Sequence, residues 1–482
     1  MGEMAPYEIV VGLEIHAQLL TESKLFSGDR NAFGGEANTH ISAITLAHPG
    51  TLPKMNEAAI ALAVKMGIAC NCEIVKYNYF ARKNYFYPDL PKGYQLSQHT
   101  TPVCKNGHVS ITTSEGVKKI RLQRIHMEED AGKSIHDIDE NYTCLDYNRA
   151  GTPLIEIVTE PDIRSADEAF AFVTAVRKLV RYLGICDGNM EEGSLRCDVN
   201  ISVRKQGDIK LGTRVEIKNL NSIRNVKRAV DSESRRLIDI LEEGESIKQE
   251  TRSYDGNTGI SIPTREKEEA DDYRYFADPD LTPFELHEEF IEGIRSSIPI
   301  LAESRAEKYI SKMHLSAYDA NLLSEEREFS DYFDALVSHT SNYKAAANWM
   351  LGPVKSWMND NASSILSFPL SPEKMASLVD LVDGNKVSFS IATTKLWQYM
   401  LADPKQDPAD IAVKENLLQQ SDSLMITEII DQVLAGMAGK VAEYKKGKKG
   451  LLALFVGEVM KMSKGKADPK MVNNILLEKL KN

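Results

Sequence analysis

The spacing of apolar residues changes once along the chain, and this change limits the fold more than any other feature of the sequence. From the N-terminus to about residue 290, apolar and polar residues alternate in period two between turn signals such as "HPGTLP" and "YDGNTG". This pattern predicts a mainly antiparallel sheet with inserted helices. Beyond Pro283 the apolar spacing is helical. The predicted fold class is therefore α+β, with a sheet-based N-terminal part followed by helices.

Helix signals support this division. One strong helical segment, residues 222–243, interrupts the sheet-forming part, and its predicted apolar face consists of Val226, Val230, Leu237 and Leu241. In the later part, Ser371 and Pro372 are typical of a helix start, and Gly384 is typical of a helix end. Helices are therefore expected to follow one another from about residue 302 onward.

The length of 482 residues is too great for one hydrophobic core. Pro404 and Pro408 in the segment "ADPKQDPAD" predict a hinge. We therefore expect three domains: a sheet domain over residues 1–290, a helical domain over 291–407, and a small helical tail domain over 408–482.

The tail domain differs from the rest of the chain in charge. The whole chain has a net charge of -12, which argues against a general nucleic-acid binder, but residues 411–482 carry 12 Lys against 8 Asp and Glu. An apolar stripe of Leu451, Phe455, Val459 and Met462 predicts a helix, and Asp468 and Pro469 predict the start of another. The lysines that flank the stripe are Lys445, Lys446, Lys448, Lys449, Lys461, Lys464, Lys466 and Lys470. They could form an RNA-binding surface or simply keep the domain soluble.

Composition excludes several other classes. No apolar stretch is long enough to span a bilayer, and the start "MGEMAPYEIVVG" lacks the basic region of a signal peptide, so a cytoplasmic location is expected. The six cysteines show neither disulfide spacing nor a CxxC pair, and we interpret them as reduced thiols. Cys70 and Cys72 form a CxC without partners at zinc-finger spacing, which leaves any metal role for them open.

Four predicted strands carry acidic and basic residues on the same face. Successive side chains of a strand point to opposite sides of its sheet, so each strand separates its apolar residues from its charged ones. The charged faces are Glu14, His16 and Gln18 in "GLEIHAQL"; Arg124, His126 and Glu128 in "RIHMEED"; Arg196, Asp198, Asn200 and Arg204 in "SLRCDVNISVR"; and Arg214, Glu216 and Lys218 in "RVEIKN". Glu129 is expected on the opposite side unless a bulge turns it. Such faces can be merely solvated, but four of them together favour a charged cradle that holds a site.

The chemistry of these faces suggests a divalent cation and a phosphorylated substrate. Carboxylate oxygens are the ligands that Mg²⁺ prefers, and Mg²⁺ commonly shares its coordination with ATP phosphates. His16 is an uncommon Mg²⁺ ligand, so we leave open whether it binds the ion or supports a ligand. Gly132-Lys133-Ser134 is not a phosphate-binding P-loop, because the required earlier glycine position is Met127.

Seven segments in order along the chain resemble one enzyme family. They are "VGLEIHAQLLTESKLFSG", "RKNYFYPDLPKGYQLSQ", "HMEEDAGKS", "DYNRAGTPLIEIVTEPD", "EEGSLRCDVNISVR", "EIKNLNS" and "DDYRYFADPDLTP". Together they resemble the B subunit of the bacterial aspartyl/glutamyl-tRNA amidotransferase, from about residue 8 to the end. The resemblance implies a glutamine-synthetase-like cradle domain, then a helical domain, then a tail domain that binds tRNA.

The resemblance also implies an activity and partners. Members of this family work with a glutaminase A subunit and a small C subunit, and they convert misacylated Glu-tRNA(Gln) or Asp-tRNA(Asn) to the amide. The side-chain carboxylate must first be activated, and phosphoryl transfer from ATP gives it a good leaving group. Ammonia is expected from the partner, because we find no Cys-His or Ser-Lys nucleophile arrangement that stands out here.

Specific residues are implied by the same resemblance. The metal-ligand candidates are Glu14, His16, Glu128, Asp198 and Glu216, with Glu129 as a weaker sixth. Of these, Glu14, His16, Glu128 and Glu216 are the candidate catalytic residues. Lys83, Arg149 and Arg196 are candidates for contacts with ATP phosphates or the substrate carboxylate.

Two other functions remain open at this point. A small-molecule ligase could use the same charged sheet to phosphorylate a free carboxylate, although it would have no evident use for the basic tail. A non-catalytic tRNA adaptor would need no divalent metal and would leave the four acidic strand faces unexplained. The sequence does not show whether Asp-tRNA or Glu-tRNA is the substrate, because the side chains of the two attached amino acids differ by only one methylene.

Overall fold

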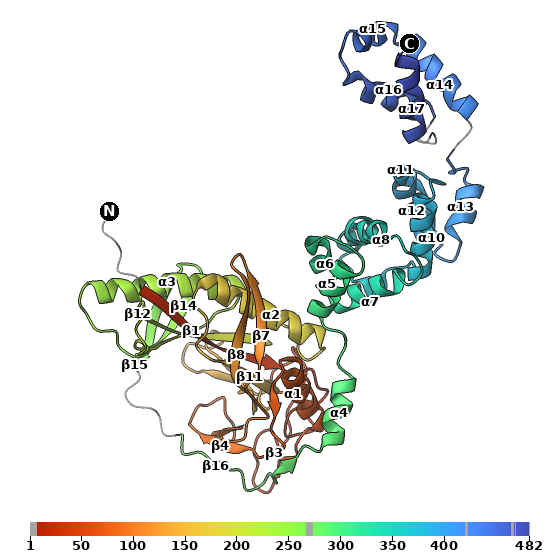
Figure 1. Ribbon diagram of the computed structural model, residues 1–482. Helices are drawn as coiled ribbons and strands as arrows, with labels where there is room; N and C mark the ends of the chain where they lie inside the picture. Colours follow the sequence, from red (N-terminus) through yellow and green to blue (C-terminus); the bar gives the residue numbers. More distant parts are fainter. Residues whose placement is uncertain (1–6, 267–272, 420–422, 464–466, 468, 482) are drawn as a thin grey trace. The chain divides into compact units, whose positions relative to one another are not determined.

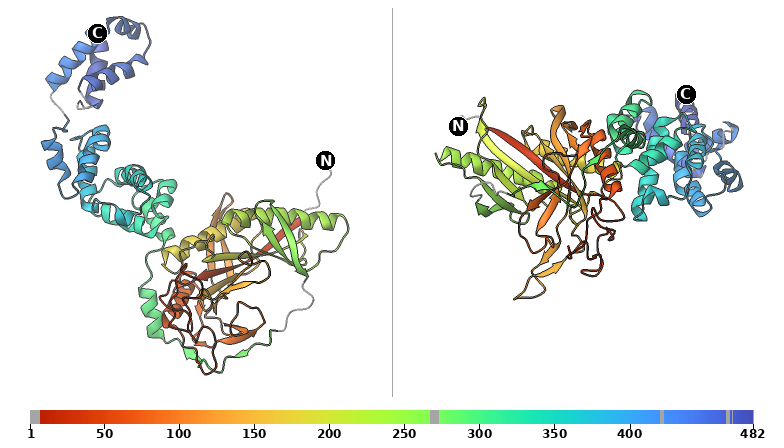
Figure 2. Two further views of the ribbon diagram at one scale, coloured as in Figure 1. Left: turned by 180° about the vertical axis from the view of Figure 1, so that it is seen from behind. Right: turned by 90° about the horizontal axis from the view of Figure 1, so that it is seen from below.

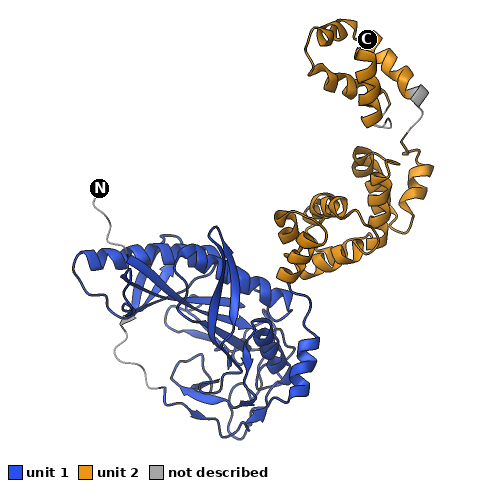
Figure 3. Ribbon diagram, in the orientation of Figure 1, with its two compact units in different colours: residues 1–301 blue, residues 302–482 orange. Residues whose placement is uncertain are grey.

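The computed structural model describes residues 7–266, 273–419, 423–463, 467 and 469–481 (Figure 1). The chain divides into two compact units, Met1–Leu301 and Ala302–Asn482 (Figure 3). Part of the last family-like segment, Asp271 and Asp272, lies outside the described residues, as do Lys464, Lys466 and Asp468 of the tail.

The first unit is built on a large sheet, as the period-two alternation predicts. Its 13 strands are β1 (Tyr7–Gln18), β2 (Glu73–Ile74), β4 (Ala81–Asn84), β5 (Tyr94–Ser97), β6 (Cys104–Lys105), β7 (His108–Thr113), β8 (Gly116–Glu129), β11 (Pro153–Thr159), β12 (Leu195–Lys205), β13 (Val215–Lys218), β14 (Glu250–Asp255), β15 (Ile260–Glu266) and β16 (Phe276–Ala277). Two separate strand pairs are β9 (Lys133–Ile135) with β10 (Cys144–Asp146), and β3 (Tyr77–Asn78) with β17 (Phe284–Glu285).

The strand order brings distant parts of the sequence together. The main path of the sheet is β15-β14-β13-β12-β1-β11-β8-β5-β4-β16. The pairing of β13 with β14 is parallel, and the other strand pairings among the described residues are antiparallel. The central strand β1 lies between β11 and β12, so its side chains are neighbours of residues more than 100 positions away.

Helices cover one face of this sheet. Those of the first unit are α1 (Glu57–Ala69), α2 (Ala166–Tyr182), α3 (Ile223–Glu242) and α4 (Glu288–Ser296). The helices α2 and α3 pack against each other and against β1 and β12 (Figures 1 and 2). The predicted helix over residues 222–243 is confirmed: the Ser222 hydroxyl accepts a hydrogen bond from the Asn225 N–H at its start, and Val226, Val230 and Leu237 are buried.

The two faces of the sheet differ as the alternation predicts. Leu13, Ile15 and Ala17 of β1 are fully buried and belong to one continuous apolar core with the helix residues Val176 and Val226. Each large apolar side chain of this kind contributes roughly 1.5–3 kcal/mol when buried. The intervening polar side chains of β1 point to the other face and are only partly buried. The hydrophobic effect therefore fixes the register that presents the polar face.

The second unit is helical, as predicted from residue 302 onward. Its elements are α5 (Ala302–Ser311), α6 (Ala317–Leu323), α7 (Arg327–Leu336), α8 (Tyr343–Trp349), the π-helical turn η1 (Met350–Val354), α9 (Lys355–Asp360), the 3₁₀ turn η2 (Ile365–Ser367), α10 (Pro372–Asp383), α11 (Phe389–Ile391), the π-helical turn η3 (Ala392–Leu396), α12 (Trp397–Ala402), α13 (Pro408–Lys414), α14 (Ser423–Gly436), α15 (Ala438–Lys445), α16 (Leu451–Met462) and α17 (Pro469–Lys481). The predicted boundaries of α10 are confirmed, since Ser371 caps its start and Gly384 follows its end.

Two separate apolar cores occur within this unit. One core extends from Ala306 to Leu417 and includes Ile411 and Ala412 of α13, a helix that the sequence analysis placed in the tail region. The other extends from Ile426 to Leu480 and contains Phe455 and Val459 of α16. Met462, the last residue of the expected stripe, is 47% exposed. No described helix is both long and apolar enough to cross a membrane.

Candidate active site

The polar face of the sheet gathers charged residues from five adjacent strands, β8, β11, β1, β12 and β13. The register places His126, Glu156, His16 and Arg196 directly opposite one another in a row across the first four of these strands. One step along, Glu14 of β1 lies opposite Asp198 of β12. Side chains directly opposite each other in a sheet have Cβ atoms about 4.5–5.5 Å apart, so these groups interact.

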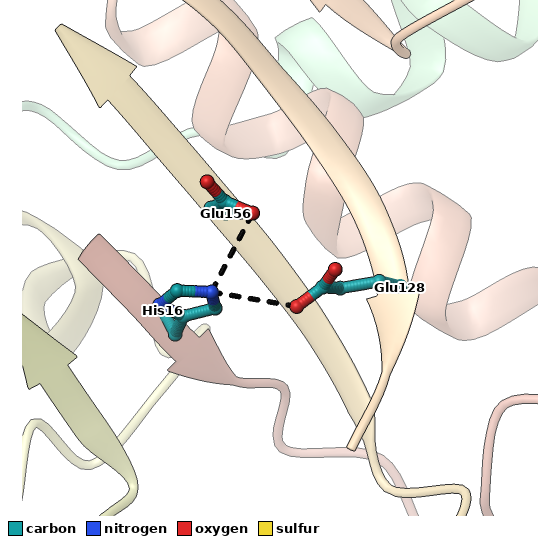
Figure 4. Close-up of side chains that lie close together, drawn as sticks. All are labelled: His16, Glu128 and Glu156. Carbon is teal, nitrogen blue, oxygen red and sulfur yellow. Dashed lines mark ion pairs between the residues drawn. The ribbon is translucent and has the colours of Figure 1, made fainter. Parts of the chain in front are cut away.

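The first group of candidate ligands consists of His16, Glu128 and Glu156 (Figure 4). The Nε2 atom of His16 lies 3.4 Å from Oε1 of Glu128 and 3.5 Å from Oε2 of Glu156. One ligand atom from each of the three residues lies within 4.8 Å of the others. An imidazole nitrogen and two carboxylates at this spacing form a donor set that fits a divalent cation.

A second histidine supports this group. Nε2 of His126 lies 3.2 Å from Oε2 of Glu156 and 3.8 Å from Oε2 of Glu128. Burial lowers the pKa of both His16 and His126, but the charges of Glu156 and Glu128 outweigh this effect and raise each pKa to about 9. Burial also acts to raise the pKa of Glu156, but the two imidazoles overcome it and hold that pKa well below its usual range.

The second group of candidate ligands consists of Glu14, Asp198 and Glu216. Their carboxylate oxygens also lie within 4.8 Å of one another. The pKa of Glu14 is raised, mainly by burial and to a smaller extent by the charges of Glu156 and Asp198. A divalent cation would relieve this repulsion, and three carboxylates are a donor set that suits Mg²⁺.

Neighbouring side chains orient the second group. Nδ2 of Asn200 donates to Oε1 of Glu14 at 2.9 Å, and the Thr251 hydroxyl donates to Oε2 of Glu216 at 2.8 Å. Nζ of Lys218 lies 2.9 Å from Oδ2 of Asp198 and 3.1 Å from Oε1 of Glu216. Burial lowers the pKa of Lys218, but the charges of Asp198 and Glu216 prevail and raise it.

Two of the predicted phosphate-binding residues meet at Asp130. Nη2 of Arg196 lies 3.1 Å from Oδ2 of Asp130, and Nε of Arg149 lies 3.7 Å from the same atom. The Nε and Nη atoms of a guanidinium offer more donors than one carboxylate uses. Arg149 also donates to the carbonyl oxygens of Ala131 and Gly132. Asp130 thus holds Arg196, which lies opposite His16 of the first group, and both arginines hold the pKa of Asp130 low against the effect of burial.

The remaining two predicted residues, Glu129 and Lys83, lie in neither group. Glu129 is buried, and its carboxylate accepts from Nζ of Lys92 at 2.5 Å and from the Leu96 N–H at 2.8 Å. Nζ of Lys83 lies over the rings of Tyr273 and Tyr85, 4.8 and 5.5 Å from their centroids. The pairing of β8 with β11 is regular at Glu129, so the alternation of β8 separates this carboxylate from that of Glu128.

Glu129 instead borders a cavity of about 230 Å³. Lys24, Thr45, Lys92 and Asp130 also line this cavity. Lys24 has no exposed surface, and burial lowers its pKa to about 8. Asp130 therefore connects the cavity with Arg196, which lies opposite His16 of the first group.

Sequence reasoning missed several residues of the site. Glu156 is the central acceptor of the first group, and its signal was a lone acidic residue in the apolar strand "PLIEIVT". Lys218 lies on the predicted face, but its sequence context indicated no role. Thr251 carried no signal because the sequence does not show that its strand β14 pairs with β13. Asp130 directly follows the predicted carboxylates but gave no signal of its own.

Comparison with known proteins gives consistent matches over almost the whole chain. Residues 9–292 match the profile of the GatB/GatE catalytic domain, and residues 331–480 match that of the GatB domain. A relative from Geotalea daltonii is 48% identical over 480 residues, which cover 98% of this chain and 99% of the relative. A relative from Pseudomonas savastanoi is 47% identical over 98% of this chain and 99% of its own length, and one from Nitratidesulfovibrio vulgaris is 45% identical over 99% and 100%. All three carry the name of the B subunit of aspartyl/glutamyl-tRNA(Asn/Gln) amidotransferase.

Proposed function

This chain belongs to the family of aspartyl/glutamyl-tRNA(Asn/Gln) amidotransferase B subunits, and from that premise we propose that it catalyses ATP-dependent amidation of a misacylated tRNA. The substrate is Glu-tRNA(Gln), Asp-tRNA(Asn) or both. A glutaminase A subunit supplies ammonia, and a small C subunit completes the complex. Since tRNA charging serves protein synthesis, the proposed place of action is the cytoplasm.

The single observation that supports this proposal best is the pair of acidic groups on one sheet face. His16, Glu128 and Glu156 form one group, and Glu14, Asp198 and Glu216 form the other. Phosphoryl transfer depends mainly on positioning and on neutralising the charge of the transferring group. Two cation-binding groups with Arg196 beside them provide both.

The proposed reaction has two steps. In the first, an oxygen of the substrate's side-chain carboxylate attacks the γ-phosphorus of ATP and ADP leaves, which gives an acyl phosphate. In the second, ammonia attacks the carbonyl carbon and inorganic phosphate leaves, which gives the amide. Mg²⁺ bound by the two groups would neutralise charge on the transferring phosphoryl group.

The chain's own residues hold the reactants in this scheme. Each cation would be held by one of the two groups, the first through His16, Glu128 and Glu156 and the second through Glu14, Asp198 and Glu216. His126 lies 3.2 Å from Glu156 and would hold this carboxylate in place. Arg196, held by Asp130, and Arg149, held by the carbonyls of Ala131 and Gly132, are proposed to contact phosphate oxygens or the substrate carboxylate. The same role is proposed for Lys83, whose Nζ lies over the rings of Tyr273 and Tyr85.

Each domain has its own proposed role. Residues 1–290 are proposed to bind ATP, the cations and the acceptor end of the tRNA, and residues 291–407 form the helical domain. The basic tail, residues 408–482, is proposed to bind the tRNA through phosphate contacts. Its exposed lysines Lys445, Lys446, Lys448 and Lys449 precede α16.

Single substitutions test the proposal in the assembled complex. Glu14→Gln, Glu128→Gln and Glu216→Gln should each abolish amide formation even when free ammonium replaces glutamine, because the lost step is phosphoryl transfer. Glu8→Gln is a matched control on the same face of β1, where Glu8 pairs with Arg204 and Arg164, and it should amidate normally. Full amidation by any two of the three variants would contradict the cation sites. ATP hydrolysis that ignores the aminoacyl-tRNA would instead favour a small-molecule ligase.

A further inference from the structure

We propose that Lys218 acts as a built-in counter-ion of the second acidic group and keeps this group from binding a divalent cation until nucleotide phosphates are present. This inference rests on the proposed function, because it assumes that the group formed by Glu14, Asp198 and Glu216 serves phosphoryl transfer. It assigns Lys218 a role in determining when the second cation site fills.

The position of Lys218 follows from the alternation of β13. Glu216 and Lys218 are two residues apart and therefore point to the same face of the sheet. Nζ of Lys218 bridges two carboxylates of the group, at 2.9 Å from Asp198 and 3.1 Å from Glu216. The ammonium thus already neutralises part of the charge that would attract a divalent cation.

The acceptors of this group are largely engaged. Oε1 of Glu216 faces Lys218 and Oε2 accepts from Thr251, while Oδ2 of Asp198 also faces Lys218. Oε1 of Glu14 accepts from Asn200. A cation bound by one oxygen of each carboxylate would take an oxygen that already contacts the ammonium, or would lie close to such an oxygen. The two positive charges would then repel each other.

The first group differs in the nature of its positive partners. His16 and His126 lie among its carboxylates, and an imidazole nitrogen can itself be a metal ligand. A lysine ammonium has three donors and no acceptor, so it cannot become a ligand and has to move. A cation can therefore replace the proton of His16 and keep this imidazole as a ligand, whereas the second group has to release Lys218.

Nucleotide phosphates offer Lys218 a replacement partner. A triphosphate carries several anionic oxygens, and Lys is a common phosphate contact in phosphoryl-transfer sites. Lys218 can then exchange its two carboxylates for a phosphate oxygen, which leaves Asp198 and Glu216 to the incoming cation. The second site would then fill together with the nucleotide.

Counting bound Mn²⁺ tests this proposal. The full-length chain is titrated with Mn²⁺, and the free ion is measured by electron paramagnetic resonance. Wild-type protein should bind one Mn²⁺ tightly without nucleotide and a second when a non-hydrolysable ATP analogue is added. Lys218→Met should bind the second ion without nucleotide, with affinity raised on the order of tenfold or more over wild type, because one unit of repelling charge is gone.

Further variants separate charge from packing. Lys218→Arg keeps the charge and should bind one ion, like wild type, and Lys218→Gln should behave like Lys218→Met if the latter folds poorly. Lys227→Met is a matched control, because Lys227 pairs with Asp167 on the helical side, and it should also bind one ion. Two tightly bound ions in wild type without nucleotide, or one ion in both Lys218→Met and Lys218→Gln, would overturn the proposal.

A different result would show that the proposed function itself is wrong. Adding Glu216→Gln to Lys218→Met should remove the second ion, and Glu128→Gln should weaken the first. If neither substitution changed the Mn²⁺ count, the two acidic groups would not be the cation sites, whatever the behaviour of Lys218.

Discussion

Removal of the Glu156 charge should change how the stability of the first unit depends on pH. Glu156 is the acceptor shared by two buried histidines, with Oε2 at 3.5 Å from His16 and 3.2 Å from His126. Both histidines have a pKa raised from 6.5 to about 9, where the carboxylate charges outweigh the opposing effect of burial. The prediction applies to protein freed of metal by a chelator.

The size of the effect follows from these values. A group with a raised pKa in the folded state contributes stability that is fully present below pH 6.5 and is lost as the pH rises through about 9. At about 1.4 kcal/mol per pKa unit, one histidine contributes ~3 kcal/mol. Because both histidines depend on the same carboxylate, we expect ~3 kcal/mol for the pair rather than twice that.

Chemical denaturation at several pH values measures this loss. The histidine pair should cost the wild-type first unit ~3 kcal/mol of unfolding free energy between pH 6.5 and 9, and less than half as much in Glu156→Gln. All three tryptophans, Trp349, Trp357 and Trp397, lie in the second unit. Far-ultraviolet circular dichroism reports the unfolding of both units, whereas tryptophan fluorescence reports the second unit alone. The transition seen only by circular dichroism therefore belongs to the first unit. Lys24, with a pKa lowered to about 8, adds stability as the pH rises above 8, but it does so in both proteins. An equal slope in wild type and Glu156→Gln would therefore refute the reasoning.

Two further predictions concern the helices. Ser222→Ala removes the hydroxyl that caps α3 and should destabilise the first unit by ~1 kcal/mol, measured by denaturation against Ser232→Ala within the same helix as control. Deletion of residues 423–482 removes the third apolar core alone, so it should raise the Michaelis constant for misacylated tRNA and reduce the salt dependence of tRNA binding without changing Mn²⁺ binding. Equal tRNA affinity and equal salt slopes for the two forms would show that the tail does not bind tRNA.

The sequence predicted the faces of the sheet well, because a strand has only two faces and burial of one of them fixes the other. Leu13, Ile15 and Ala17 are buried as expected, and Glu14 and His16 lie on the polar side. Glu128 and Glu216 were also placed on the correct face. What alternation could not provide is the order of the strands, which decides that Glu128 joins His16 while Glu216 joins Glu14.

The site residues that the sequence did not reveal were missed for the same reason. Glu156 belongs to the site because β11 lies between β1 and β8, and nothing in the sequence of β11 alone states its neighbours. Glu129 follows a predicted ligand directly, but it points into another environment and pairs with Lys92. The domain boundary at residue 408 was limited in another way. Pro404 and Pro408 suggest a hinge, but Pro408 begins α13, and Ile411 and Ala412 of this helix pack into the core that extends from Ala306 to Leu417.

Isotope transfer from the substrate tests the central claim most directly. Misacylated tRNA whose side-chain carboxylate carries ¹⁸O is amidated by the complex with ATP and free ammonium, and the released inorganic phosphate is analysed by mass spectrometry. An acyl phosphate formed at the site of Glu14, Glu128 and Glu216 leaves one carboxylate oxygen on phosphorus, so labelled phosphate should appear in step with the amide. Amide formation with unlabelled phosphate would contradict the proposed phosphorylation of the side-chain carboxylate.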